Sequence, residues 1–148
     1  MPSSLKTIAF GSEVFPARQL ALWRKYVPNA RYINLYGPTE ATGMSCYYVV
    51  DREFKEDEVI PIGRPFPNTG ILLLNEDGKE VTQGEKGEIC IRGTAVTMGY
   101  YRQPEKTAAN FVQNPLNKDY PEIIYKTGDL GYYNDRGELM FASRKDYQ

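Results

Sequence analysis

The segment from Asn34 to Glu40, Asn-Leu-Tyr-Gly-Pro-Thr-Glu, gathers residue types that could hold a base, a phosphate and a cation. Tyr36 offers a flat face to a base, and the Gly-Pro turn after it brings the backbone close to a ligand. Thr39 can donate a hydrogen bond to a phosphate oxygen, and Glu40 can bind a hard cation such as Mg²⁺. On composition alone, a purely structural turn after a buried strand is the favoured alternative.

The chain contains no histidine among its 148 residues. Catalysis by Ser-His-Asp or Cys-His groups and imidazole metal sites are therefore excluded within it. Cys46 and Cys90 lie far apart and lack the spacing of a metal or redox motif, so we expect two small buried thiols. Any chemistry must use carboxylates, backbone dipoles, Lys, Arg or a hard cation.

Charge and hydropathy narrow the range of partners. With 18 basic and 19 acidic residues the net charge is -1, which gives no broad attraction to nucleic acid or to an anionic membrane. No apolar run approaches the roughly 20 residues that span a bilayer, and the first residues show no secretory leader pattern. We therefore expect a cytoplasmic protein that binds neither nucleic acid nor membrane.

The first part of the chain reads as a strand, a helix and a second strand. Residues 7–10 are a short apolar run, apolar residues then recur at helical spacing after Pro16, and residues 32–35 form another apolar run. Such a unit favours a parallel sheet, with ligands at the carboxyl ends of the strands. Gly11 and Gly37 follow the two strand ends, so their loops are expected to converge there.

The pattern changes after about residue 60. The charged stretch 51–58 is predicted to be a solvated connector. From Pro61 onward, short apolar runs alternate with turn signals, which is typical of hairpins in a small β-barrel or sandwich. Pro104 is expected to open one short helix.

Five segments of the chain resemble, in order, signature motifs of the adenylate-forming superfamily, which holds acyl-CoA synthetases, luciferases and adenylation domains of non-ribosomal peptide synthetases. The chain is identified as a member of this group because the motifs follow one another at plausible spacing over almost its whole length. Ser143 stands where the family usually has Gly. The segments are residues 10–13 (loop beside the adenine), 34–40 (adenine and Mg²⁺), 87–101 (barrel motif), 125–130 (ribose) and 143–148 (start of the hinge).

The resemblance implies roles for individual residues. Tyr36 would stack on adenine, with Asn34 near its amino edge. Thr39 would contact the α-phosphate and Glu40 would hold Mg²⁺, which makes these two the candidate catalytic residues. Asp129 would accept hydrogen bonds from both ribose hydroxyls. The residues assigned to ATP or AMP in this way are Gly11, Ser12, Glu13, Asn34, Tyr36, Gly37, Thr39, Asp129 and Arg144.

Further positions match the family's substrate pocket and its hinge. Asp146 matches the hinge about which a small lid domain swings. The pocket positions are uncharged, so an apolar or small substrate side chain is expected, although simple core packing is an even alternative. The matching pocket residues are Ile8, Phe10, Leu35, Gly43 and Met44.

Within the family, residues 61–68 and 99–105 are most similar to the amino-acid-activating branch. The implied protein activates a carboxylic acid, an amino acid in this branch, as an acyl-adenylate and passes it to the phosphopantetheine thiol of a carrier protein. A D-alanine–carrier-protein ligase is the runner-up, which Phe10 disfavours because that ligase typically has a smaller residue there. A nucleotide-binding module without catalysis and a purely structural β-rich interaction domain are the alternatives from other classes.

The expected fold is α/β, a fragment of a parallel α/β sheet subdomain over residues 1–60 and a small distorted β-barrel subdomain over 61–148 that ends at the hinge. The family's phosphate loop and its catalytic lysine have no match in the sequence. We therefore expect an internal piece that adenylates negligibly by itself, which carboxylate-dependent pyrophosphate exchange would measure. Bared sheet edges in residues 1–60 are expected to make it self-associate, which light scattering would measure.

Overall fold

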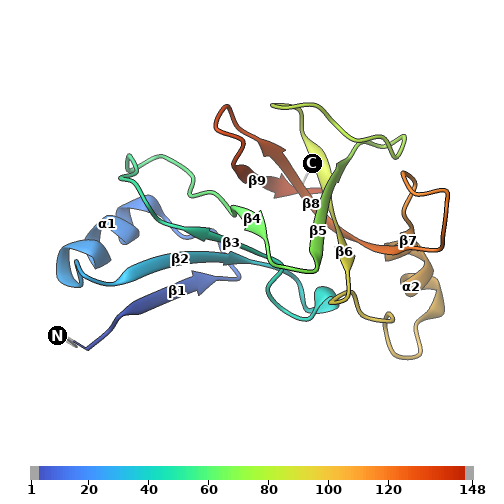
Figure 1. Ribbon diagram of the computed structural model, residues 1–148, viewed down its shortest axis with the longest axis horizontal. Coiled ribbons are helices and arrows are strands. Elements are labelled where there is room, and N and C mark those ends of the chain that lie inside the picture. Colours follow the sequence, from blue (N-terminus) through green and yellow to red (C-terminus); the bar gives the residue numbers. More distant parts are fainter. Residues whose placement is uncertain (1–3, 146–148) are drawn as a thin grey trace.

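The computed structural model describes residues 4–145 as two sheets with one helix beside each. Figure 1 shows an elongated molecule in which β1–β3 and α1 lie at one end and β7 and α2 at the other. Within the described range neither helix has the length and apolar character needed to cross a membrane. The elements are β1 (Thr7–Gly11), α1 (Ala17–Tyr26), β2 (Arg31–Tyr36), a 3-10 turn (Thr39–Ala41), β3 (Cys46–Val49), β4 (Arg64–Pro65), β5 (Thr69–Leu74), β6 (Gly87–Gly93), α2 (Pro104–Asn110), β7 (Phe111–Gln113), β8 (Ile123–Tyr133) and β9 (Leu139–Arg144).

The first sheet has the strand order β1-β2-β3-β4. β1 and β2 are parallel and α1 joins them, which confirms the predicted strand-helix-strand unit. β3 and β4 are antiparallel to their neighbours, so the sheet is mixed. The predicted parallel pairing holds for β1 and β2 and does not extend to β3 and β4. The loop between β2 and β3 is too short for the crossover of about a dozen residues that a parallel pair needs.

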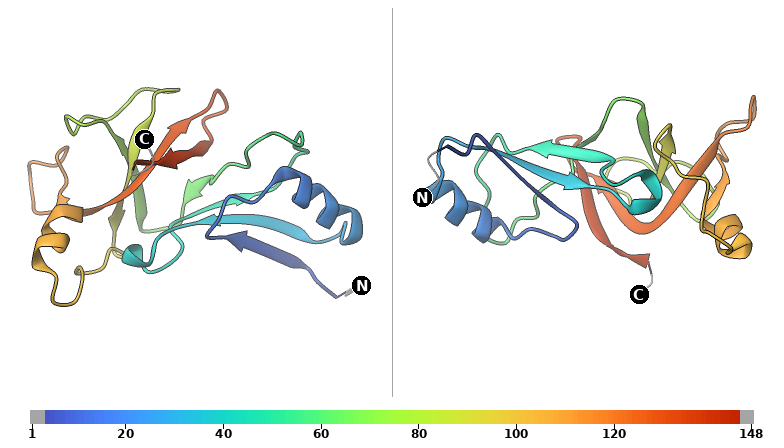
Figure 2. Two further views of the ribbon diagram at one scale, coloured as in Figure 1. Left: turned by 180° about the vertical axis from the view of Figure 1, so that it is seen from behind. Right: turned by 90° about the horizontal axis from the view of Figure 1, so that it is seen from below.

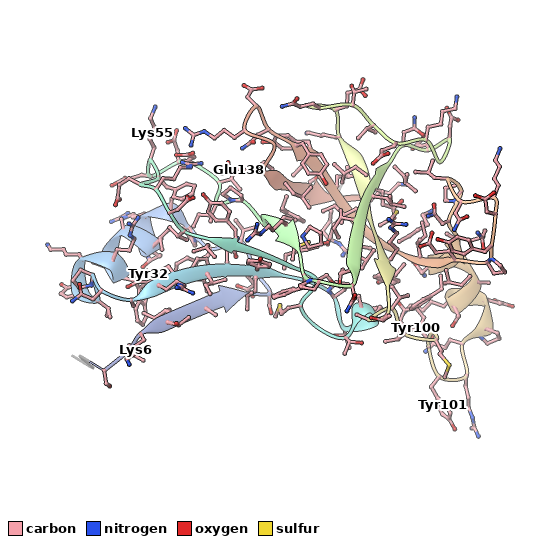
Figure 3. The ribbon with its side chains drawn as sticks, in the orientation of Figure 1. Lys6, Tyr32, Lys55, Tyr100, Tyr101 and Glu138 are labelled. Carbon is pink, nitrogen blue, oxygen red and sulfur yellow. The ribbon has the colours of Figure 1, made fainter. Side chains whose placement is uncertain are left out.

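Helix α1 covers the first sheet through a few apolar residues. Ala17 and Leu20 are buried against Tyr32 of β2, which Figure 3 labels beside the helix. Trp23, which helical spacing would place on the same face, is 45% exposed. The helix therefore buries a narrower stripe than its apolar residues suggest.

The second sheet is antiparallel, with the order β5-β6-β8-β7 and with β9 paired to β8. This confirms the predicted hairpins. β8 is a long strand of 11 residues, and the segment 125–130, which resembles the ribose motif, lies within it. Figure 2 shows this strand curving strongly. β7 pairs with its first residues, β9 with its last, and β6 pairs along its middle from Tyr125 to Gly131.

A shared apolar cluster joins the two sheets. Cys46 of β3 and Ile62 pack with Leu73, Ile89 and Leu139 of the second sheet. Burial raises the pKa of the Cys46 thiol to about 12, and burial likewise raises that of Cys90 to about 12. Both cysteines are free and buried, as expected for thiols that serve as small apolar side chains. The subdomain boundary near residue 60 stays a prediction.

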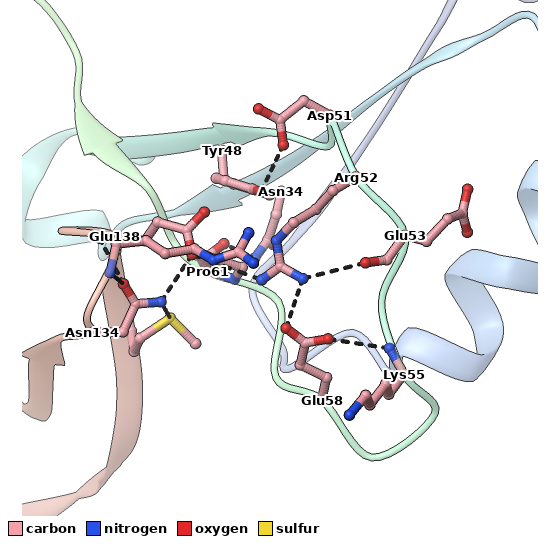
Figure 4. A network of polar contacts seen from close by, with 12 residues as sticks. Asn34, Tyr48, Asp51, Arg52, Glu53, Lys55, Glu58, Pro61, Asn134 and Glu138 are labelled. Carbon is pink, nitrogen blue, oxygen red and sulfur yellow. Dashed lines mark hydrogen bonds and ion pairs between the residues drawn. The ribbon is translucent and has the colours of Figure 1, made fainter.

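The connector 51–58 is less solvated than its charge suggested. The Arg52 guanidinium forms an ion pair with Glu58, which Figure 4 shows, at 2.6 Å. It forms a second, longer one at 3.7 Å with Glu138, which follows the turn of the β8–β9 hairpin. The Arg52 side chain is only 20% exposed and its guanidinium lies 3.8 Å from the centre of the Phe54 ring. The prediction of a fully solvated connector is therefore wrong at Arg52.

Gly37 lets the chain reverse after β2. A Cβ at this position would lie 2.1 Å from the Gly43 carbonyl oxygen and 2.4 Å from the Ser45 nitrogen, both backbone atoms. Thr42, with φ of 57°, completes the reversal in the left-handed region.

We expect Gly37→Ala to lower the free energy of unfolding by about 1–3 kcal/mol, because backbone atoms cannot move away from the added methyl group. Urea titration would measure the loss. Gly70→Ala is the matched control, because the Cβ it adds meets only the side chain of Arg92, which can swing aside. Equal stability of the two variants would contradict the prediction.

Candidate functional site

A cavity of about 370 Å³ opens between the two sheets, a size typical of small-molecule sites. One wall is the carboxyl end of β2 with the Gly37-Pro38 turn, and the loop after β1 lies beside it. The opposite wall comes from β8 and β9, and residues 59–62 contribute a third side. The cavity thus lies where the sequence placed the convergence of the two glycine loops.

The structure gathers some of the predicted site residues around this cavity and leaves others outside its lining. Asp146 lies outside the described residues. Those that line the cavity are Ser12, Glu13, Asn34, Leu35, Tyr36, Gly37, Asp129 and Arg144. Those that do not line it are Gly11, Thr39, Glu40, Ile8, Phe10, Gly43 and Met44.

The Asp129 carboxylate is the centre of the polar contacts in the cavity. The Tyr36 hydroxyl donates to its Oδ2 at 2.6 Å, and Arg144 Nη1 donates to its Oδ1 at 2.9 Å. The residue is only 8% exposed. Burial raises the pKa of the Tyr36 phenol and the negative Asp129 raises it further, so the hydroxyl stays a donor. Each carboxylate oxygen has more than one lone pair, so this fixed group can still accept hydrogen bonds from a ligand.

The backbone of Asp129 is held by its neighbour in β8. The Asp129 amide donates to the Thr127 hydroxyl at 3.0 Å, and that hydroxyl donates to the Ile89 carbonyl of β6 at 2.7 Å. Gly128, in the left-handed region at φ of 72°, donates its amide to Glu88 Oε1 at 3.1 Å. These bonds fix the backbone of Asp129, and the bonds from Tyr36 and Arg144 fix its carboxylate.

Asn34 connects the β2 wall of the cavity to the side formed by residues 59–62. It is 6% exposed, and its Nδ2 donates to the Pro61 carbonyl oxygen at 2.9 Å (Figure 4). This bond fixes the amide orientation and draws residues 59–62 against the end of β2. The place of Asn34 at the amino edge of an adenine stays a prediction.

Phe141 lines the cavity although sequence reasoning placed it only in a hairpin strand. In a regular strand Phe141 and Arg144 would point to opposite faces, because side chains alternate. The register between β8 and β9 shifts here, so that Leu130 faces Ser143, Gly131 faces Phe141 and Ala142 has no partner. This bulge lets both side chains reach one cavity, and alternation in the sequence could not reveal it.

Glu40 lies in the turn after Pro38 and belongs to a second cluster of polar side chains. The Tyr100 hydroxyl donates to Glu40 Oε1 at 2.6 Å, and the Tyr125 hydroxyl lies 3.4 Å from that of Tyr100. Burial raises the pKa of Glu40, but the hydrogen bond from Tyr100 and the nearby charge of Lys106 outweigh burial and leave the pKa below its ordinary value. The carboxylate is therefore ionised at neutral pH. Thr39, beside it, is exposed.

The donors around Glu40 limit the kind of metal site that is possible. Residues 4–145 hold no group of three or more His, Cys, Asp or Glu side chains that could cage an ion. Mg²⁺ is commonly bound by one or two carboxylates together with phosphate oxygens of a substrate. Glu40 therefore fits a Mg²⁺ ion that arrives with a nucleotide, and does not fit a resident ion.

The predicted substrate-pocket residues do not assemble around the cavity. Phe10 packs on Phe15, with 4.2 Å between ring centroids, and Ile8 joins the apolar cluster beneath α1. Gly43 and Met44 lie on the loop beyond the 3-10 turn, and only Leu35 lines the cavity. Their assignment to substrate selection stays a prediction.

The family model and the related proteins that match this chain agree with one another. The family model described as AMP-binding enzyme matches residues 1–101. Bacitracin synthase 1 of Bacillus licheniformis is 38% identical over 146 residues, which cover 99% of this chain and 3% of that protein. A D-alanine–D-alanyl carrier protein ligase of Streptococcus pneumoniae (strain 70585) is 38% identical over 140 residues, which cover 94% of this chain and 26% of that protein. The chain thus spans a small part of the length of these relatives.

Solved structures share the fold. The structure of holo-PA1221, an NRPS protein containing adenylation and PCP domains bound to a vinylsulfonamide inhibitor, has a TM-score of 0.87 and 32% sequence identity. The match covers 95% of this chain and 24% of that chain.

We expect Tyr36→Phe to lower the free energy of unfolding by about 1.5–3 kcal/mol, because it removes a hydrogen bond to a buried carboxylate that joins the two sheets. Chemical denaturation would measure the change. Tyr26→Phe, at a position 52% exposed on α1, serves as control and should change stability by less than about 0.5 kcal/mol. If the two variants were equally stable, the Tyr36 hydroxyl would have no structural role.

Proposed function

Because the chain belongs to the AMP-binding enzyme family, we propose that it is part of an ATP-dependent ligase that activates an amino acid as an acyl-adenylate and transfers it to the thiol of a carrier protein. The observation that carries the proposal is the buried Asp129 carboxylate, held between Tyr36 and Arg144 at a cavity of nucleoside size. We also propose a cytoplasmic location for the protein.

The nucleoside end of ATP is proposed to occupy the cavity. Asp129 has two oxygens that can each accept a hydrogen bond from a ribose hydroxyl, and its orientation is fixed before the ligand arrives. The Tyr36 ring and the loop at Ser12 and Glu13 both line the cavity, which supports their proposed roles on the two sides of the base. Binding to a preorganised site costs less than ordering one on contact.

The phosphate end is proposed to lie toward the Gly37-Pro38 turn and Thr39. The close approach of backbone at Gly37 and the exposed Thr39 hydroxyl support a contact with the α-phosphate. Mg²⁺ bound with the phosphates would neutralise charge at the reacting phosphorus, and Glu40 is the proposed protein ligand for it. Arg144, near the ribose, adds a positive charge on the other side. Positioning and charge neutralisation of this kind suit phosphoryl chemistry in a chain that lacks histidine.

Two relatives support the carrier protein as acceptor. One is named as a ligase for D-alanyl carrier protein, and the other is an NRPS protein that contains adenylation and PCP domains. The uncharged residues at the proposed pocket positions favour a small or apolar amino acid. We also propose that residues 1–60 and 61–148 are the two subdomains. The strand pairing changes from the first sheet to the second after β4, a few residues beyond this boundary.

The proposal predicts that the full-length protein catalyses amino-acid-dependent exchange of pyrophosphate into ATP. Asp129→Asn should lower kcat/KM for ATP by about 10- to 100-fold, since an amide accepts one ribose hydrogen bond and carries no charge. Asp135→Asn, in the turn of the β8–β9 hairpin, is the matched control and should exchange as the wild type does.

Replacement of ATP by 2′-deoxy-ATP tests the same contact from the ligand side. The wild type should discriminate against the deoxy nucleotide, and Asp129→Asn should lose most of this discrimination. AMP binding without exchange for any amino acid would instead favour a nucleotide-binding module that lacks catalysis.

A further inference from the structure

The turn that carries Glu40 is fastened to a loop of the second sheet. Thr97 donates its amide to the Glu40 carbonyl at 2.9 Å, and the Thr42 hydroxyl donates to the Ala95 carbonyl at 2.7 Å. The Tyr100 hydroxyl adds the 2.6 Å bond to the Glu40 carboxylate. Three hydrogen bonds thus join the loop after β2 to the loop between β6 and α2, on a short stretch of chain.

Tyr100 is itself held in place on several sides. Its ring meets Phe111 edge to face, with 5.6 Å between centroids, and Lys106 Nζ lies 4.2 Å from the ring centroid. Its amide donates to the Thr107 hydroxyl at 2.9 Å. α2 and the start of β7 therefore hold Tyr100, so that its hydroxyl has little freedom to leave Glu40.

The neighbouring tyrosine shows the contrast. Tyr101 is 83% exposed and projects away from the body of the molecule, whereas Tyr100 turns inward (Figure 3). Arg102 lies over the exposed Tyr101 ring, 5.3 Å from its centroid. Of these two adjacent tyrosines, Tyr100 packs against other side chains and Tyr101 is exposed to solvent.

The donor that Tyr100 supplies to Glu40 is an uncharged hydroxyl. Among residues 4–145 no Lys or Arg forms an ion pair with Glu40 within 4 Å. A neutral hydroxyl orients a carboxylate without cancelling its charge, whereas an ammonium or guanidinium group at the same distance would compete with a cation. The carboxylate is therefore held by a hydroxyl and is not paired directly with a cationic side chain, although Lys106 lies nearby over the Tyr100 ring.

We propose that Tyr100 is a positioning residue whose hydroxyl fixes the Glu40 carboxylate in the orientation that receives the magnesium ion of the bound nucleotide. The inference rests on the proposed function, in which Glu40 is the protein ligand of that ion. Tyr100 contacts neither the nucleotide nor the ion in this arrangement and acts through Glu40 alone.

Tyr100→Phe in the full-length protein tests the proposal, because it removes the hydroxyl and keeps the ring against Phe111 and Lys106. Calorimetric titration with ATP at several Mg²⁺ concentrations, without amino acid, gives the factor by which Mg²⁺ tightens ATP binding. We expect this factor to fall about tenfold in Tyr100→Phe. Tyr101→Phe is the matched control and should keep the wild-type factor.

AMP binding without Mg²⁺ separates positioning from general damage. Tyr100→Phe should bind AMP as the wild type does, since its effect is confined to the metal end. An unchanged Mg²⁺ factor would overturn the proposal. So would an equal loss of AMP affinity, because that would indicate a merely structural role.

Glu40→Gln distinguishes a failure of the inference from a failure of the proposed function. If Glu40→Gln keeps the wild-type Mg²⁺ factor, the assignment of Glu40 as metal ligand is wrong and the inference falls with it. If Glu40→Gln reduces the factor and Tyr100→Phe does not, only the inference is overturned. The double variant should be no weaker in its response to Mg²⁺ than Glu40→Gln alone, because both changes act on one carboxylate.

Discussion

The hydrogen bonds from Tyr36 and Arg144 to the buried carboxylate of Asp129 tie together β2, β8 and β9, the strands whose side chains form the two main walls of the cavity. A carboxylate buried without such donors would be strongly destabilising, because it loses its hydration. The three residues are therefore interdependent, and the shape of the cavity depends on their remaining together. Preorganised donors and acceptors of this kind are what a nucleotide site needs, since they need no rearrangement when the ligand arrives.

Much of the architecture could be predicted from apolar runs and turn residues, because these follow from local rules. The strand-helix-strand unit and the hairpins after residue 60 were of this kind. The antiparallel β3 could not be predicted as easily, since it depends on a reversal in which Gly37 meets the backbone of Gly43 and Thr42 adopts a left-handed conformation. Neither condition is visible in residue type alone.

Only some of the residues that line the cavity could be predicted from the sequence. The motifs drew attention to Tyr36, Asp129 and Arg144, and the fold brings these three residues together from positions far apart in the chain. Phe141 was missed because its place depends on a bulge at Ala142, and a bulge changes the alternation on which strand patterns rest. Arg52 was misjudged because a run of charged residues resembles a solvated loop. Its side chain instead pairs with Glu58 within that run and with Glu138, which is distant in sequence.

Strand β8 carries contacts to both halves of the candidate site. Tyr125, next to the Tyr100–Glu40 pair, and Asp129, in the cavity, lie on the same buried face of this one strand. Gly128, with φ of 72°, and a register shift against β6 interrupt the regular strand between these two residues. This one irregular segment therefore sets the distance between the proposed sugar contact and the proposed metal contact. Inserting or deleting one residue here would displace Asp129 from Tyr36 and Arg144, whereas the exposed residues 135–137 of the hairpin turn can vary in length. In homologous proteins the spacing between these two positions should therefore stay constant while the nearby turns change.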